Sequence, residues 1–120
     1  MASRRPVASE PRFLYAVRSR FTSREVRAEF IAWLADGHLA DVVKAGALDA
    51  ELVEFEPDPE RGSDAIGDVE SRYHFASREA FERYAAGPAV ALRAEGMAKF
   101  PPDRGIVMTR IFASSVVRVP

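Results

Sequence analysis

The chain contains no cysteine among its 120 residues. Disulfide bonds, thiol chemistry and cysteine-based zinc sites are therefore excluded, and the composition is compatible with a reducing cytoplasm. Histidine is also scarce, since only two are present, and no carboxylates recur with the spacing of metal ligands. We therefore expect no metal and no cofactor, and we predict a cytoplasmic protein.

Neither sign of charge is in excess, because 17 Lys and Arg residues balance 18 Asp and Glu residues, for a formal net charge of −1. This balance gives no electrostatic reason to expect a nucleic-acid or anionic-membrane partner. No apolar run approaches the roughly 20 residues of a membrane span. Residues 1–11 have no apolar stretch after Arg4 and Arg5, so we expect no signal peptide there. We predict a flexible N-terminal arm over 1–11 and one domain over 12–120.

The patterns that are present alternate between strand and helix. Alternating apolar and polar side chains predict strands over Phe13–Phe21 and Val69–Phe75. Shorter apolar runs predict two more strands, over Leu48–Phe55 and Ile106–Phe112. Residues 56–67 hold two prolines and two glycines, which indicates a long hairpin loop.

Helical periodicity fills the gaps between these strands. Thr22 followed by Glu25 has the spacing of a capping box, and Gly37 is the expected left-handed stop. Between them an apolar stripe recurs at i, i+4, i+7 and i+8, which is one face of a helix. Its members are Val26, Phe30, Trp33 and Leu34. Ser77 is the expected cap of a second helical unit. The residues expected to be buried near the end of that unit are Val90, Ala94 and Met97.

The resulting order is βαββαβ, an α+β arrangement. With right-handed crossovers it predicts a ferredoxin-like fold with an antiparallel sheet of order 4-1-3-2 and helices on one face only. The open face would carry Leu14, Ala16, Arg18, Arg20, Arg72 and His74. A face of mixed apolar and charged residues favours a homodimer packed sheet to sheet. The alternative is a monomer with a solvated sheet face.

Three segments carry a resemblance to a known family. Trp33–Ala47 reads WLxxGHLxxVxxAGA, Tyr73–Tyr84 reads YHFxSRExFERY, and Leu92–Phe100 reads LRAEGMxxF. Over about residues 13–112 the chain resembles the small bacterial family called domain of unknown function 4286, of the dimeric α/β-barrel superfamily. The resemblance implies the ferredoxin-like fold and the homodimer. It implies no reaction, because that family has no assigned activity.

The two histidines are the candidate catalytic residues. His38 lies at the expected helix break, where it could act as a general base or as a donor lining a pocket. The alternative is a structural histidine that bonds the helix end or a partner chain. His74 lies on the open face of the third strand.

The candidate ligand-binding residues are Arg18, Arg72, His74 and Trp33. The cations of this set could hold a small anionic ligand if the open face lines a cavity between two sheets. The alternative is a salt-bridge network in which Glu51 and Glu54 neutralise them. Trp33 would meet an aromatic ligand.

RNA-binding sheets expose aromatic side chains, so Tyr15, Tyr73 and Phe75 need an explanation. Their parity places them on the helix-covered face with the core, and no RNP1-like pattern occurs. We therefore expect no RNA partner.

The sequence thus predicts a homodimeric domain that binds a small molecule or serves as an interaction module. The alternative is a cofactor-free enzyme, like the monooxygenases of the same superfamily, acting on a small organic substrate. A cavity bordered by His38 or His74 would favour the enzyme.

Overall fold

The computed structural model describes residues 11–120. The elements are β1 (Phe13–Phe21), α1 (Arg24–Trp33), a π-helical turn (Leu34–His38), α2 (Leu39–Lys44), β2 (Asp49–Glu54), a 3-10 turn (Pro59–Arg61), β3 (Val69–Phe75), α3 (Arg78–Ala86), α4 (Ala89–Lys99), a 3-10 turn (Pro102–Arg104) and β4 (Ile106–Ser114). This order confirms the predicted βαββαβ arrangement. The predicted N-terminal arm lies outside the described residues except for Pro11.

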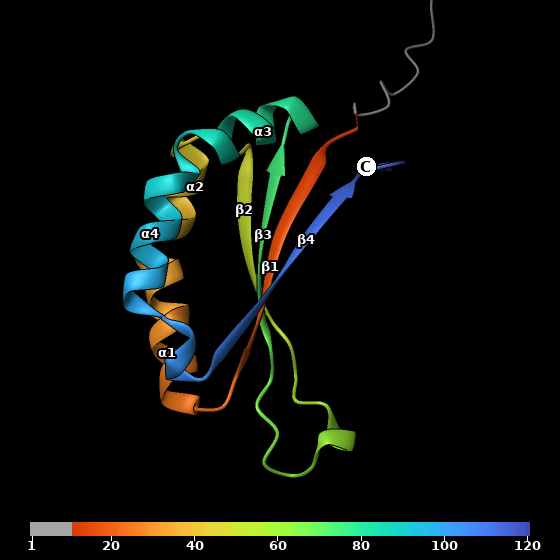
Figure 1. Ribbon diagram of the computed structural model, residues 1–120. Coiled ribbons are helices and arrows are strands. Elements are labelled where there is room, and N and C mark those ends of the chain that lie inside the picture. Colours follow the sequence, from red (N-terminus) through yellow and green to blue (C-terminus); the bar gives the residue numbers. More distant parts are fainter. Residues whose placement is uncertain (1–10) are drawn as a thin grey trace, which may run out of the picture.

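The four strands form one antiparallel sheet in the order β2-β3-β1-β4, which confirms the predicted order read from the other edge. Figure 1 shows that the helices all cover the same face and leave the other bare. The β2–β3 loop extends beyond the end of the sheet. No helix in the described part of the chain is long and apolar enough to span a membrane.

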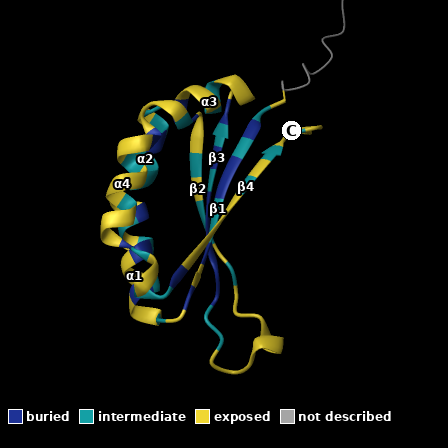
Figure 2. Ribbon diagram, in the orientation of Figure 1, coloured by how far each residue is buried: buried dark blue, intermediate teal, exposed yellow. Residues whose placement is uncertain are grey.

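The core lies between the helices and the sheet. Alternation in β1 and β3 directs Phe13, Tyr73 and Phe75 toward the helices, and all three are buried. They belong to one cluster of buried side chains, while a second cluster around Phe30 and Phe100 fills the other end. Figure 2 shows the contrast with β4 and the β2–β3 loop, which are largely exposed.

The predicted N-cap of the first helix is wrong, and so is the left-handed conformation predicted for Gly37. Ser23, not Thr22, is the N-cap, because its hydroxyl accepts a hydrogen bond from the Val26 amide at 3.3 Å. The Thr22 hydroxyl instead donates to the Gly105 carbonyl. Gly37 has φ 167°, an extended rather than left-handed value, but its non-helical backbone kinks the chain between α1 and α2, so the predicted break of the helix at Gly37 is confirmed.

The predicted buried side of α4 is also wrong. Val90, Ala94 and Met97 are all exposed. Ala89, buried at the first position of the helix, sets a different rotation, and Gly96 then faces the core. A Cβ on Gly96 would lie 3.1 Å from the Trp33 ring, so glycine lets α4 approach α1 closely.

Candidate functional site

A cavity of about 360 Å³ lies between the helical layer and the sheet. Helices α1 and α4 form one wall, and strands β1, β3 and β4 form the other. Its apolar lining includes Val17, Phe30, Trp33, Leu92, Phe100 and Ile106. The volume is within the ~300–1,000 Å³ range of small-molecule sites, and the aromatic lining is typical of them.

Three tyrosines bring phenol groups to this cavity. Burial raises the pKa of Tyr73, and it raises the pKa of Tyr84 to about 12. Burial also raises the pKa of Tyr15, although Arg110 and Arg93 oppose the shift. The phenols are therefore neutral at physiological pH, and they can donate hydrogen bonds to a ligand.

His38 reaches the cavity from the π-helical turn. Its ring stacks on Trp33, with 4.1 Å between ring centroids and 24° between planes. Trp33 is the last residue of α1, and His38 directly follows the kink at Gly37. Burial lowers the pKa of His38, while Glu95 and Asp41 oppose that shift. The ring is therefore neutral at pH 7, and its buried Nδ1 has no hydrogen-bond partner among the described residues.

Two arginines complete the polar lining. Arg93 comes from α4 and Arg110 from β4, so they approach the cavity from opposite walls. Both residues are exposed, which places them at the cavity mouth. Arg93 donates a long hydrogen bond, 3.4 Å, to the Ala85 carbonyl. Among residues 11–120, no carboxylate forms an ion pair with either arginine.

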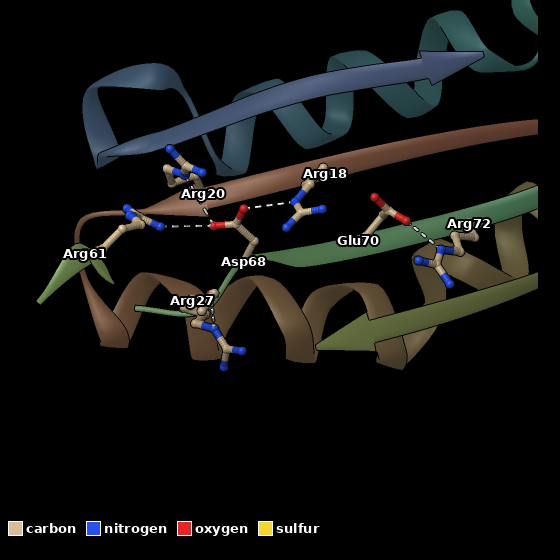
Figure 3. Close-up of polar contacts among 8 residues, drawn as sticks. Arg18, Arg20, Arg27, Arg61, Asp68, Glu70 and Arg72 are labelled. Atoms are coloured by element: carbon tan, nitrogen blue, oxygen red, sulfur yellow. Dashed lines mark hydrogen bonds and ion pairs between the residues drawn. The ribbon is translucent and has the colours of Figure 1, made fainter. Parts of the chain in front are cut away.

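The open face of the sheet carries a different group of arginines. Asp68, only 5% exposed, accepts hydrogen bonds from Arg18 Nε at 2.9 Å and Arg20 Nε at 3.3 Å. Arg61 of the β2–β3 loop lies 3.7 Å from the same carboxylate. Figure 3 shows these three arginines converging on Asp68. The Arg18 guanidinium also stacks over the Phe55 ring, 3.9 Å from its centroid.

The remaining open-face candidates are paired as well. Arg72 hydrogen-bonds Glu70, and His74 Nδ1 lies 2.7 Å from Asp49 Oδ1. Among the described residues of the single chain, neither Glu51 nor Glu54 pairs with these cations, and salt bridges from these glutamates to a second subunit stay a prediction. Glu54 instead pairs with Arg27 of α1.

The sheet divides the predicted site residues into two groups. Trp33 and His38 line the cavity, whereas Arg18, Arg72 and His74 lie on the opposite face and do not border it. The predicted set is therefore not one site. Within residues 11–120, no group of three or more His, Cys, Asp or Glu side chains is placed to hold a metal ion.

Sequence reasoning missed most of the polar lining, namely Ser71, Tyr73, Tyr84, Arg93 and Arg110. One signal could have found Arg110. It lies between Met108 and Phe112 on the helix-facing parity of β4, opposite Val17 of β1. A charged residue on a core-facing parity indicates a hollow or an opening in the core.

The chain matches no protein-family model and no curated protein. Solved structures share its fold. A dimeric ferredoxin-like protein from an uncultured marine organism has a TM-score of 0.61 and 16% identity, over 92% of this chain and 100% of that one. The monooxygenase ActVA-Orf6 of Streptomyces coelicolor, in complex with nanaomycin D, has a TM-score of 0.62 and 15% identity, over 90% of each chain. SnoaB, a cofactor-independent oxygenase from Streptomyces nogalater, has a TM-score of 0.58 and 18% identity, over 91% of this chain and 97% of that one. At such identities the likeness shows only that this chain has the fold of dimeric ferredoxin-like proteins.

Proposed function

We propose that this chain is a homodimeric domain that binds a small organic molecule in the cavity between its helices and its sheet. The observation that carries the proposal is the cavity of about 360 Å³, with an aromatic lining and a few converging polar groups. A pure interaction module would not need such a cavity. Cytoplasmic location and membership of the domain of unknown function 4286 family are further proposals, supported by the sequence alone.

The bare sheet face supports the homodimer. It combines apolar side chains, among them Ile111 and the exposed Val107, with the ion pairs of Asp68 and Glu70. A second copy would cover this face. Two of the solved structures with this fold are dimeric ferredoxin-like proteins, which agrees with the proposal.

The binding function can be tested with Nile red, a neutral dye that fluoresces in apolar surroundings. We expect the dye to enter the cavity, and we expect Val17→Phe, which adds a ring to the cavity wall, to abolish the signal. Val90→Phe is the matched control, because Val90 is 56% exposed on α4 and does not line the cavity. Equal fluorescence from both variants would mean that the dye binds elsewhere and would contradict the proposal.

The second candidate function is a cofactor-free enzyme, and the neutral His38 favours it. Because Nδ1 is buried, Nε2 is the nitrogen that would take a proton from an acidic C–H group of a substrate. The products of this step are an imidazolium and a carbanion. If dioxygen is the co-reactant, a CH2 group and O2 give a C=O group and water.

The proton-transfer step has a direct measurement. We expect the protein to accelerate exchange of the acidic CH2 protons of 2-indanone in D2O, followed by proton NMR. His38→Gln should remove the acceleration, whereas His74→Gln, on the opposite face of the sheet, should retain it. Exchange at the buffer rate with the unaltered protein would count against this enzymatic role and leave the binding proposal standing.

A further inference from the structure

The cavity lining is unbalanced in charge. Two arginines line the cavity, and no aspartate or glutamate does. The chain as a whole has a formal net charge of −1, so this local excess is not a property of the composition. Arg93 and Arg110 are also unusual because, among the described residues, neither has a carboxylate partner, in contrast to Arg18 and Arg72 on the open face.

We propose that the cavity selects a planar aromatic carboxylate, with its carboxylate between Arg93 and Arg110 and its ring against Trp33. This inference rests on the proposed binding function and adds the chemical class of the ligand. Guanidinium groups bind carboxylates through charge-assisted, often bidentate hydrogen bonds. Two arginines on opposite walls of one mouth can hold the same anion.

The electrostatic field of these arginines reaches the cavity wall. Both lower the pKa of Tyr15 and of Tyr84, against the larger effect of burial. The phenols stay protonated, so they can donate hydrogen bonds to an anion and do not repel it. An acidic ligand would therefore meet cations and hydrogen-bond donors at the mouth, with no opposing carboxylate in the lining.

The shape of the lining favours a planar ring. The rings of Trp33 and Phe100 both line the cavity, with 5.5 Å between their centroids and 54° between their planes, and His38 stacks on Trp33. Aromatic side chains pack against a flat ligand through offset-stacked and edge contacts. A flexible acyl chain would gain less from such walls.

Titration calorimetry with 2-naphthoate and 2-naphthamide separates charge from shape, because the two ligands share a ring system. We expect the carboxylate to bind about tenfold more tightly, which corresponds to ~1.4 kcal/mol. Arg93→Met and Arg110→Met keep the aliphatic stem of each side chain, and each should remove most of this preference. Arg78→Met is the control, because Arg78 is an exposed arginine of α3 that does not line the cavity.

The possible outcomes distinguish a failure of this inference from a failure of the proposed binding function. Equal affinity for naphthoate and naphthamide would overturn the anionic preference, and dodecanoate binding as tightly as naphthoate would overturn the planar one. If Nile red enters the cavity but neither naphthalene ligand binds, this inference fails while the binding function stands. If Nile red does not enter the cavity either, both this inference and the proposed binding function are wrong. Thermal melting of each arginine variant within the range of the Arg78→Met control confirms that the fold is retained.

Discussion

The two faces of the sheet use arginine in opposite ways. On the open face, Arg18, Arg20 and Arg72 are each hydrogen-bonded to Asp68 or Glu70, whose side chains are buried. On the helix-covered face, Arg93 and Arg110 border an apolar cavity without a carboxylate partner among the described residues.

The arginines of the open face stabilise the protein's own structure, whereas the two arginines at the cavity are available to bind another molecule. A paired arginine must first lose its partner before it binds an anion, and a carboxylate left buried alone is costly. An unpaired arginine beside a cavity has no such cost. The open face therefore suits association with another protein surface, and the cavity suits a ligand.

The largest contrast should be in stability. Phe75 is fully buried on the helix-covered face, so Phe75→Ala should lower the free energy of unfolding by about 3–5 kcal/mol. Phe112→Ala is the matched change on the same face of β4, where Phe112 is 52% exposed, and should cost less than about 1 kcal/mol. Urea unfolding of both variants measures the difference. Similar losses would mean that β4 is covered, for example by a second chain.

Asp68→Asn tests how much the open-face ion pairs contribute. We expect a loss of ~1–2 kcal/mol, because the arginines that lose their partner remain partly solvated. Burial raises the pKa of Asp68, but hydrogen bonds and charges from Arg18 and Arg20 outweigh it and hold the pKa below 3.8.

The sign of the pH dependence follows from that direction. A lowered pKa in the folded state contributes stability above pH 3.8, and this contribution is lost as the pH falls through the folded value. The stability difference between the unaltered protein and Asp68→Asn should therefore shrink in acid. Asp103→Asn, at an exposed carboxylate of the Pro102–Arg104 turn, is the control. A difference that stays constant down to pH 2 would contradict this account of Asp68.

Arg72→Glu tests whether the open face is the dimer interface. The change breaks the pair with Glu70 and places a carboxylate opposite Glu51 of β2. We expect self-association to weaken about tenfold, or ~1.4 kcal/mol, measured by sedimentation at micromolar concentration. Arg78→Glu makes the same charge change on α3 and should have no such effect. If both variants sediment like the unaltered protein, the open face is not the interface.

Where the two faces of a strand differ in character, the ends of that strand could be predicted from the sequence almost to the residue. In Phe13–Phe21 and Val69–Phe75 the aromatic side chains fall on one face and the arginines on the other, and both predicted ranges are confirmed. Helix details were harder. Thr22 and Ser23 are both good caps, and only the tertiary bond from Thr22 to Gly105 decides between them. Gly37 was correctly predicted to interrupt the helix, but the left-handed conformation predicted for it was wrong.

The site could be predicted only in part because a cavity is a property of two layers, not of one element. His38 and Trp33 stood out as rare residues near a helix break, and both line the cavity. Tyr73 was correctly predicted to lie under the helices, but the pattern of a strand does not tell a filled core from a hollow one. Arg93 lies three residues after Val90 and four before Met97, so it borders the predicted buried side of α4, but one arginine at that place does not distinguish a cavity mouth from solvent.

We expect the smallest effect from the protonation of His38, which lies at the cavity on the helix-covered face of the sheet. Its folded pKa is below 6.5, so the neutral ring adds stability above pH 6.5 that is lost as the pH falls through the folded value. An imidazolium stacked on an indole quenches its fluorescence, and Trp33 is the only tryptophan. Emission should therefore fall with a midpoint below pH 6.5. His38→Gln should abolish this transition, and His74→Gln should leave it intact. A midpoint above pH 6.5 would mean that Glu95 and Asp41 outweigh burial, and His38 would then be a cation at the cavity wall.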